Sequence, residues 1–482
     1  MSGYVKPEVK TNFSKTPIFV WLIVAMALYA FCLYSVADYI FSPQNQPFLN
    51  LLAGKIGALL GLSLPFVPLL LVLIVVYSVV SLILGYLLTW LISKLAEEVT
   101  VVFSLLVPIV FVAFGIAIVT FGAITEPTAA IVGIVVAGIG LLMLLFVLWR
   151  FRSLRRSGRF VEFSAQLVLD EKAVLGMPIL LGLFSSFTGL LVFFGEIRLV
   201  TLFTVQTSNG SEIQPVGFII MIAFAYTFLI VYLGFYYFLN AYVISYASDW
   251  YRGLDPDLPS AHKDVKQILP VVIKFAFVMA TVKLIVQLAA SATHRQARGK
   301  NVGSAMAGLV MAGIASFIIQ IIGAIWEFLN YFTLISAVQN KTSLSDSIRD
   351  SAKTSWNSFM DVIVGETGYG ISMFVFAVIN TLIWFTFGFA FGFSVFPPVA
   401  GFDKAIIGIV LGVVFIVLSS LPYTIVTMPM KIAFQTFIYS YAKDYTEGFS
   451  KPSKLPVEFR DEFKTLQSRH EKRRMRDPTQ IF

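Results

Sequence analysis

Residues 64–92 read LPFVPLLLVLIVVYSVVSLILGYLLTWLI, and this stretch contains no Asp, Glu, Lys or Arg. A helix needs about 20 apolar residues to cross the bilayer hydrocarbon core of about 30 Å. In lipid the backbone must satisfy its own hydrogen bonds, and an α-helix does so within a single segment. The stretch therefore predicts a membrane-spanning α-helix.

The rest of the chain has the same character. Its 482 residues are 58% hydrophobic and only 13% charged, with a mean hydropathy of +0.84, whereas soluble domains carry about 25% charged residues. We therefore expect an all-α fold, a polytopic transmembrane helical bundle of about ten spans in the cell membrane. The expected spans are residues 17–39, 64–92, 101–121, 129–149, 177–195, 217–246, 270–290, 306–338, 370–396 and 405–428. The first is too long for a signal peptide, so we expect it to be a retained anchor.

Basic residues set the expected orientation. Lysines and arginines are concentrated in residues 449–482, after the last expected span, and such clusters favour the cytoplasmic side. Ten spans then place the N-terminus, residues 1–16, in the cytoplasm as well. The expected organisation is a five-span bundle over 17–195 with a basic cytoplasmic segment at 150–176, a second five-span bundle over 217–448 and the charged cytoplasmic tail.

The basic segment carries five arginines, and we expect them to contact anionic lipids. They are Arg150, Arg152, Arg155, Arg156 and Arg159. One loop disagrees with the charge rule, because Arg295, Arg298 and Lys300 would lie outside the cell. The helix at 270–290 could therefore be re-entrant or interfacial instead of spanning.

Two expected spans carry a candidate intramembrane polar site. Residues 270–290 include Lys274 and Lys283, and the following span includes Gln320, Glu327 and Asn330. A lysine at the centre of the membrane costs about 2.5 to 3.5 kcal/mol on translocon scales, so it is not expected to face lipid unpaired. We expect a Lys283–Glu327 pair. The five residues then line a polar pathway or a midplane binding site; alternatively, Lys274 reaches the interface and Glu327 lies close to the cytosol.

Residues 344–363 have the pattern of an amphipathic helix. Apolar residues recur at helical intervals from Leu344 through Ile348, Ala352 and Trp356, which predicts a helix lying in the membrane interface or docked on the bundle. Ser343 or Ser345 is expected to cap its N-terminus.

Two expected helix ends have similar sequences. SYASDWYRG at 245–253 matches SYAKDYTEG at 440–448 at five of nine positions. This similarity is either a duplicated helix-exit motif or a chance product of the aromatic residues expected at the interface.

Several short motifs give the chain a resemblance to known proteins. They are Asn240, residues 246–256, residues 279–282, residues 346–351, Gly365 with Glu366, and residues 437–442. In their order, over about residues 217–448, the chain resembles a widespread bacterial and archaeal family of polytopic membrane proteins without an assigned function. That family supplies no catalytic residues. The chain is also similar to choline transporter-like proteins in its expected ten spans, its cytoplasmic ends and residues 346–353. Other details of that family are missing here, so a choline substrate does not follow.

No motif in the sequence indicates an enzyme. The phosphate-binding, zinc-protease and G-x-S-x-G patterns are absent, and His262, His294 and His470 are scattered. With Cys32 as the only cysteine, we expect no disulfide and no thiolate metal cluster. We therefore expect no catalytic residues, cofactor or metal, although distant residues of an intramembrane hydrolase could still converge in space. The net charge of +8 is explained by anionic lipid and not by nucleic acid.

Two functions remain. The first expectation is a non-enzymatic component or scaffold of a membrane assembly, with other membrane subunits or further copies of this chain as partners. The alternative is a transporter or channel for a small solute. Convergence of the intramembrane polar residues on one water-accessible cavity would favour transport, and their separation to the two interfaces would favour the scaffold.

Overall fold

A computed structural model describes residues 16–42, 66–122, 127–207, 210–296, 319, 321–395 and 404–447, almost entirely as α-helix. The helices are α1 (Thr16–Phe41), α3 (Phe66–Gly122), α4 (Pro127–Asp170), α5 (Ala173–Phe203), α6 (Pro215–Tyr251), α7 (Leu258–Gln296), α9 (Thr333–Asn340), α10 (Leu344–Asn357), α11 (Phe359–Val395) and α12 (Lys404–Glu447). Strands β1 (Thr204–Thr207) and β2 (Gly210–Ile213) pair in an antiparallel hairpin between α5 and α6.

Seven helical segments in these ranges are long and apolar enough to cross a membrane. They are Ile83–Phe121, Ala130–Asp170, Ala173–Phe203, Pro215–Tyr251, Leu258–Ala289, Ile321–Asn340 and Val362–Ser394. The structure thus confirms the helical fold class, while the count of ten spans and the orientation of the ends stay predictions. Two further expected spans have shorter apolar stretches in the described residues, Ile23–Tyr39 and Lys404–Ile416.

Two polar stretches beside expected spans are helical in the structure. The spans at 64–92 and 101–121 belong to one continuous helix, α3, which runs for 57 residues. The polar residues between them, SKLAEEV at 93–99, include Lys, Leu, Ala and Glu, which are strong helix formers. Likewise α4 continues through the arginines of the basic segment at 150–176 to Asp170, with a kink at Arg150, and the cytoplasmic place of this segment stays a prediction.

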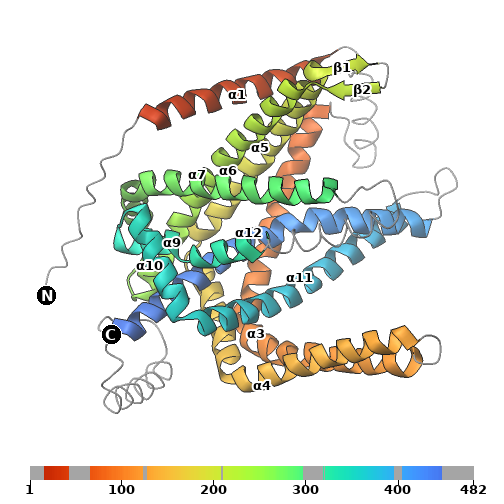
Figure 1. Cartoon of the computed structure of the whole chain (residues 1–482), viewed down its shortest axis with the longest axis vertical. Coiled ribbons are helices and arrows are strands. Elements are labelled where there is room, and N and C mark those ends of the chain that lie inside the picture. The colour runs from red at the N-terminus through yellow and green to blue at the C-terminus, as the bar shows by residue number, and fades with distance from the viewer. Residues whose placement is uncertain are drawn as a thin grey trace, which may run out of the picture.

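The helices diverge from one end of the molecule (Figure 1). The C-terminal part of α3 and the N-terminal part of α4 form a projecting hairpin, and α11 and α12 form a second one. Glycines let these helices approach closely. A Cβ atom on Gly115 would lie 2.4 Å from the backbone nitrogen of Ala137, and one on Gly388 would lie 2.8 Å from the carbonyl oxygen of Leu411. Small residues at such crossings are typical of membrane helices.

The largest group of buried side chains lies where α6, α7, α9 and α12 meet. Aromatic rings fill it: Trp250 and Tyr251 stack on Phe437, and Phe332 contacts Tyr439. The two similar segments at 245–253 and 440–448 contact each other through Asp444, which accepts from Tyr251 at 3.1 Å and pairs with Arg252. They also share one partner, because the Gln339 amide donates hydrogen bonds to Ser248 and Ser440, both at 2.8 Å. Helices of both expected five-span bundles pack together, with α4 against α11 and α12.

The helix α10 covers residues 344–357 of the expected amphipathic helix, but it docks mainly by a polar face that is adjacent to the apolar stripe. Ser343 is its N-cap, as expected, and accepts from the Asp346 backbone nitrogen. The buried residues are polar: Ser347, Ser351, Thr354 and Ser355. On the apolar stripe, by contrast, the side chain of Trp356 is 71% exposed.

Candidate functional site

A cavity of about 900 Å³ lies among α5, α6, α7, residues 321–340, α11 and α12. We call it the central cavity. Four of its lining side chains are charged: Lys283, Glu327, Glu366 and Lys431. Three carry amides: Asn240, Asn330 and Gln435. Six tyrosines also line it: Tyr232, Tyr236, Tyr237, Tyr331, Tyr369 and Tyr423.

Three of the five residues expected at an intramembrane polar site line this cavity. Lys283 lies on α7, and Glu327 and Asn330 lie on the candidate span Ile321–Asn340. Lys274 is exposed on α7 and is not among the lining residues. Gln320 lies outside the described residues. Whether the group works as a functional site stays a prediction.

The expected ion pair between Lys283 and Glu327 does not form in the described structure. Both side chains are exposed, and together they line the central cavity and a smaller one of about 330 Å³ beside it. Each therefore faces open space between α7 and the next helical segment, and no ion pair brings the two charges together.

Sequence reasoning missed the charges on the opposite wall. Glu366 and Lys431 were left out because apolar spans were expected at 370–396 and 405–428, whereas α11 begins at Phe359 and α12 continues to Glu447. One signal was available, because Gly365 with Glu366 was among the motifs of the family resemblance. Because both residues lie just outside the expected spans, the sequence did not show that they belong to the same helices as those spans.

Hydrogen bonds hold one oxygen of Glu366 in position. The Tyr331 hydroxyl donates to Oε1, and the Gln435 amide donates to the same oxygen at 3.4 Å. Tyr331 lies in the turn before α9, and Gln435 lies on α12. Two more tyrosines join α11 and α12 along the cavity: Tyr369 donates to the carbonyl oxygen of Thr427 at 2.9 Å, and Tyr423 donates to that of Met373 at 2.7 Å.

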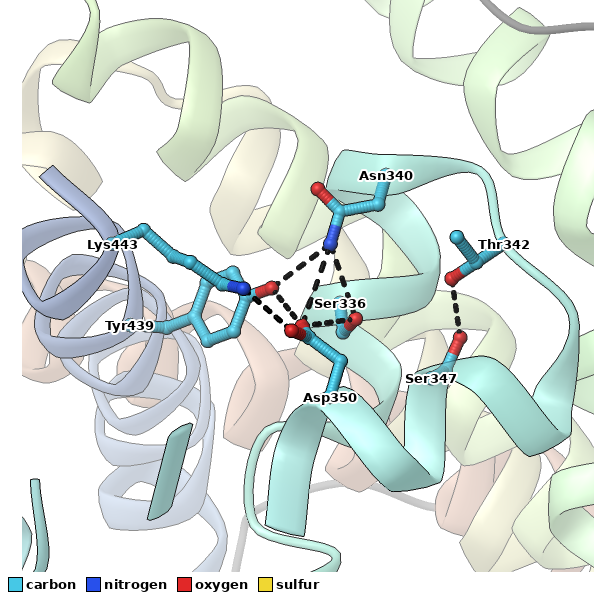
Figure 2. A network of polar contacts seen from close by, with 7 residues as sticks. All are labelled: Ser336, Asn340, Thr342, Ser347, Asp350, Tyr439 and Lys443. Carbon is cyan, nitrogen blue, oxygen red and sulfur yellow. Dashed lines mark hydrogen bonds and ion pairs between the residues drawn. The ribbon is translucent and has the colours of Figure 1, made fainter. Parts of the chain in front are cut away.

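A second polar group, the Asp350 cluster, joins α9, α10 and α12 (Figure 2). It comprises Ser336, Asn340, Asp350, Tyr439 and Lys443. The Asp350 carboxylate accepts from Ser336 at 2.8 Å, from Tyr439 at 2.6 Å and from Lys443 at 2.5 Å. Burial alone would raise the pKa of Asp350, but the hydrogen bonds from Lys443, Tyr439 and Ser336 outweigh it and lower the pKa below its ordinary value.

Further ion pairs surround the Asp350 cluster. Lys341 lies 3.1 Å from Asp264 at the start of α7, and both side chains are largely buried. Arg252, just after α6, donates to both carboxylate oxygens of Asp444 on α12 at 2.8 Å. Charges at this end of the molecule are thus held by partners on other helices.

The arginines expected to contact anionic lipid make protein contacts on α4. Arg155 and Arg159 pair with Glu97 of α3 at 2.5 and 2.8 Å, and Arg156 donates to the Tyr441 hydroxyl at 3.4 Å. Arg150 lies over the Trp149 ring at 4.2 Å. Arg152 is exposed, and the side chain of Arg155 remains 57% exposed in its ion pair, so lipid contact stays a prediction for this segment.

Comparisons with known proteins supply no family for this geometry: no family model matches the chain, and no curated protein matches its sequence. Within the residues that the structure describes, no group of three or more His, Cys, Asp and Glu side chains could hold a metal ion.

Proposed function

We propose that this protein is a membrane transporter that binds a small polar solute in the central cavity. The observation that carries the proposal is the convergence of Lys283, Glu327, Glu366 and Lys431 on one cavity from four helical segments. Charged residues within membrane helices are costly, and those that face a shared interior cavity mark solute or ion pathways. Of the two functions expected from the sequence, this arrangement favours transport.

The dimensions of the central cavity support the proposal. Binding sites for small molecules usually measure about 300 to 1,000 Å³ and combine an apolar lining with a few polar groups. This cavity, at about 900 Å³, adds Phe275, Met279 and Met428 to its tyrosines and charges. A bundle of several spans with cytoplasmic ends, in the cell membrane, completes the proposal, and it is supported by the apolar segments and the basic tail.

The scaffold function has one observation in its favour. The α3–α4 hairpin projects away from the other helices (Figure 1) and exposes large apolar side chains, including Phe114, Phe121 and Trp149. Such a surface fits another membrane subunit as well as lipid. Native mass spectrometry of the protein in mild detergent separates the two: stoichiometric subunits would support the scaffold, and a protein without them would support an independent carrier.

Ligand screening tests the transporter directly. Purified protein in detergent is screened for thermal stabilisation by a panel of the twenty amino acids, sugars, carboxylic acids and quaternary amines, since a ligand that binds only the folded state raises its stability. Each hit is then tested as a radiolabelled solute for uptake into proteoliposomes. The proposal predicts at least one stabilising solute whose uptake is lost in Lys283→Ala and Glu327→Ala.

The control is Lys274→Ala, on the same helix as Lys283 but outside the cavity lining. It should retain both stabilisation and uptake. Absence of any stabilising solute in the panel, or equal loss of uptake in Lys274→Ala and Lys283→Ala, would contradict the proposal.

A further inference from the structure

The charges of the central cavity are balanced in sign and distributed over its walls. Two are positive, Lys283 on α7 and Lys431 on α12, and two are negative, Glu327 on residues 321–340 and Glu366 on α11. Each comes from a different helical segment. The lining therefore has no net formal charge, yet it offers both signs to whatever occupies the cavity.

None of these four side chains forms an ion pair within the described part of the chain. The described charges near the Asp350 cluster behave differently: Asp350 pairs with Lys443, Asp264 with Lys341, and Asp444 with Arg252. A membrane protein usually matches its interior charges, because an isolated one costs about 2.5 to 3.5 kcal/mol even on lenient scales. Lys283, Glu327 and Lys431 are exposed and Glu366 is half-buried, so the four charges of the central cavity are open to a solute that brings charges of its own.

Glu366 and Lys431 give the most specific arrangement. Oxygen Oε1 of Glu366 accepts from Tyr331 and Gln435, while no described donor reaches Oε2. Lys431 precedes Gln435 by four residues on α12, so the two lie on the same face with Cβ atoms about 5 to 6 Å apart. The Glu366 carboxylate therefore contacts Gln435, and Lys431 lies about one helical turn from Gln435 on α12.

We infer that the central cavity binds a zwitterion, a small molecule or headgroup with an ammonium and an acidic group, whose ammonium contacts Glu366 and whose acidic group contacts Lys431. This inference rests on the proposed transport function. Tyrosines add to the ammonium site, because the Tyr331 hydroxyl donates to Glu366 and Tyr369 also lines the cavity, and aromatic faces attract cations. A simple cation would leave the lysines unmatched, and a simple anion would leave the glutamates unmatched.

Two sources could supply this chemistry, a free amino-acid-like solute or the headgroup of a zwitterionic lipid. Two sets of probes distinguish these sources. Within each set the compounds are similar in structure and differ in charge. The first set is L-leucine, leucine methyl ester and 4-methylpentanoate. The second is glycerophosphoethanolamine, ethanolamine and glycerol 3-phosphate. Each set contains a zwitterion, a cation and an anion, and the affinity of the purified protein for each is measured in detergent.

The expected result is that, in one set, the zwitterion binds at least about tenfold tighter than either singly charged member. Lys431→Gln should weaken the zwitterion about tenfold and leave the cation unchanged, whereas Glu366→Gln should weaken the zwitterion and leave the anion unchanged. Lys274→Gln should change neither. A misfolded variant would instead lose all probes together, so the opposite selectivities of the two variants separate binding from folding.

Other outcomes overturn the inference in distinguishable ways. If the cation or the anion binds as tightly as the zwitterion, the ligand class is wrong although the cavity still binds solute. If neither set binds while another solute of the wider panel is transported, the zwitterion is wrong and the transporter stands. If nothing in the wider panel binds, both proposals fail.

Discussion

At the residue scale, Asp350 is the side chain on which most partners converge. It takes hydrogen bonds from α9 and α12 while lying on α10 itself (Figure 2). The ionised carboxylate is the form that these donors stabilise. Its lowered pKa therefore links the docking of α10 to the protonation of one group.

The sign of this linkage gives a prediction. A carboxyl group with a lowered pKa in the folded state contributes stability that is fully present above its unfolded pKa of about 3.9 and is lost as the pH falls through the lowered folded value. The melting temperature should fall between pH 4 and pH 2 more steeply for the native protein than for Asp350→Asn. Differential scanning fluorimetry in detergent measures both. Asp346→Asn, an exposed carboxylate on the same helix, should keep the native slope; equal slopes for the native protein and Asp350→Asn would contradict the linkage.

The sequence singles out residues of the central cavity only where an unusual residue stands inside an apolar run. Lys283, Glu327 and Asn330 attract notice for that reason, and the structure places all three at the central cavity. Glu366 and Lys431 lie at the edges of apolar runs, where charge is ordinary. Only the extended lengths of α11 and α12 bring them to the same cavity, and those lengths depend on tertiary packing beyond the apolar windows.

At the element scale, α10 separates what periodicity can predict from what it cannot. Its helical form and its Ser343 cap followed from the sequence. The face by which α10 docks did not follow from the sequence, because hydroxyl groups, and not apolar side chains, hold that face against the protein. Ser351 is fully buried, donates to the carbonyl oxygen of Leu329 at 2.8 Å and accepts from the backbone nitrogen of Phe332 at 3.0 Å.

Replacing that hydroxyl group should destabilise the protein. Ser351→Val leaves two buried backbone groups without a partner, at about 1 to 3 kcal/mol each, so we expect a loss of about 3 kcal/mol in the free energy of unfolding. Ser345→Val, at an exposed position of the same helix, should change it little. Chemical denaturation in detergent measures the difference. A Ser345→Val protein as unstable as Ser351→Val would show that the loss does not come from the buried contacts.

The α3–α4 hairpin offers a matched test of its packing. Gly115→Ala places a Cβ atom 2.4 Å from the Ala137 nitrogen, whereas a Cβ atom on Gly138, one residue beyond Ala137, would meet nothing within 4 Å. Steric overlap should make Gly115→Ala less stable by about 1 to 3 kcal/mol. Gly138→Ala should be neutral or slightly stabilising, because alanine favours the helix. Thermal unfolding of both variants in detergent is the measurement, and equal melting temperatures would contradict the close crossing.

At the scale of the whole molecule, hydropathy predicted the helical fold class but not how each helix continues. The charged stretch at 93–99 lies between two expected spans and the arginines at 150–159 follow another, yet α3 and α4 pass through them as continuous helices. Their charges are accommodated between the two helices, where Glu97 takes both Arg155 and Arg159. Hydropathy does not detect such pairing, because it scores each residue alone.

Two distant parts of the chain also meet in a way that only the fold reveals. The similar segments at the ends of α6 and α12 lie against each other and share Gln339 of α9. These segments end α6 and α12, and both helices line the central cavity. The molecule thus combines a tightly paired polar end with a cavity whose charges lack partners among the described residues.

Cysteine accessibility tests the central claim that this cavity is open to water and solute. In a Cys32→Ala background, which removes the only native cysteine, Thr424→Cys and Val410→Cys are compared in lipid nanodiscs with a charged methanethiosulfonate reagent. Both positions are exposed on α12, but only Thr424 lines the central cavity. Such a reagent needs a water-exposed thiolate. Our account predicts rapid labelling of Thr424→Cys and little labelling of Val410→Cys, which should face lipid; equal labelling of the two, or none at Thr424→Cys, would contradict it.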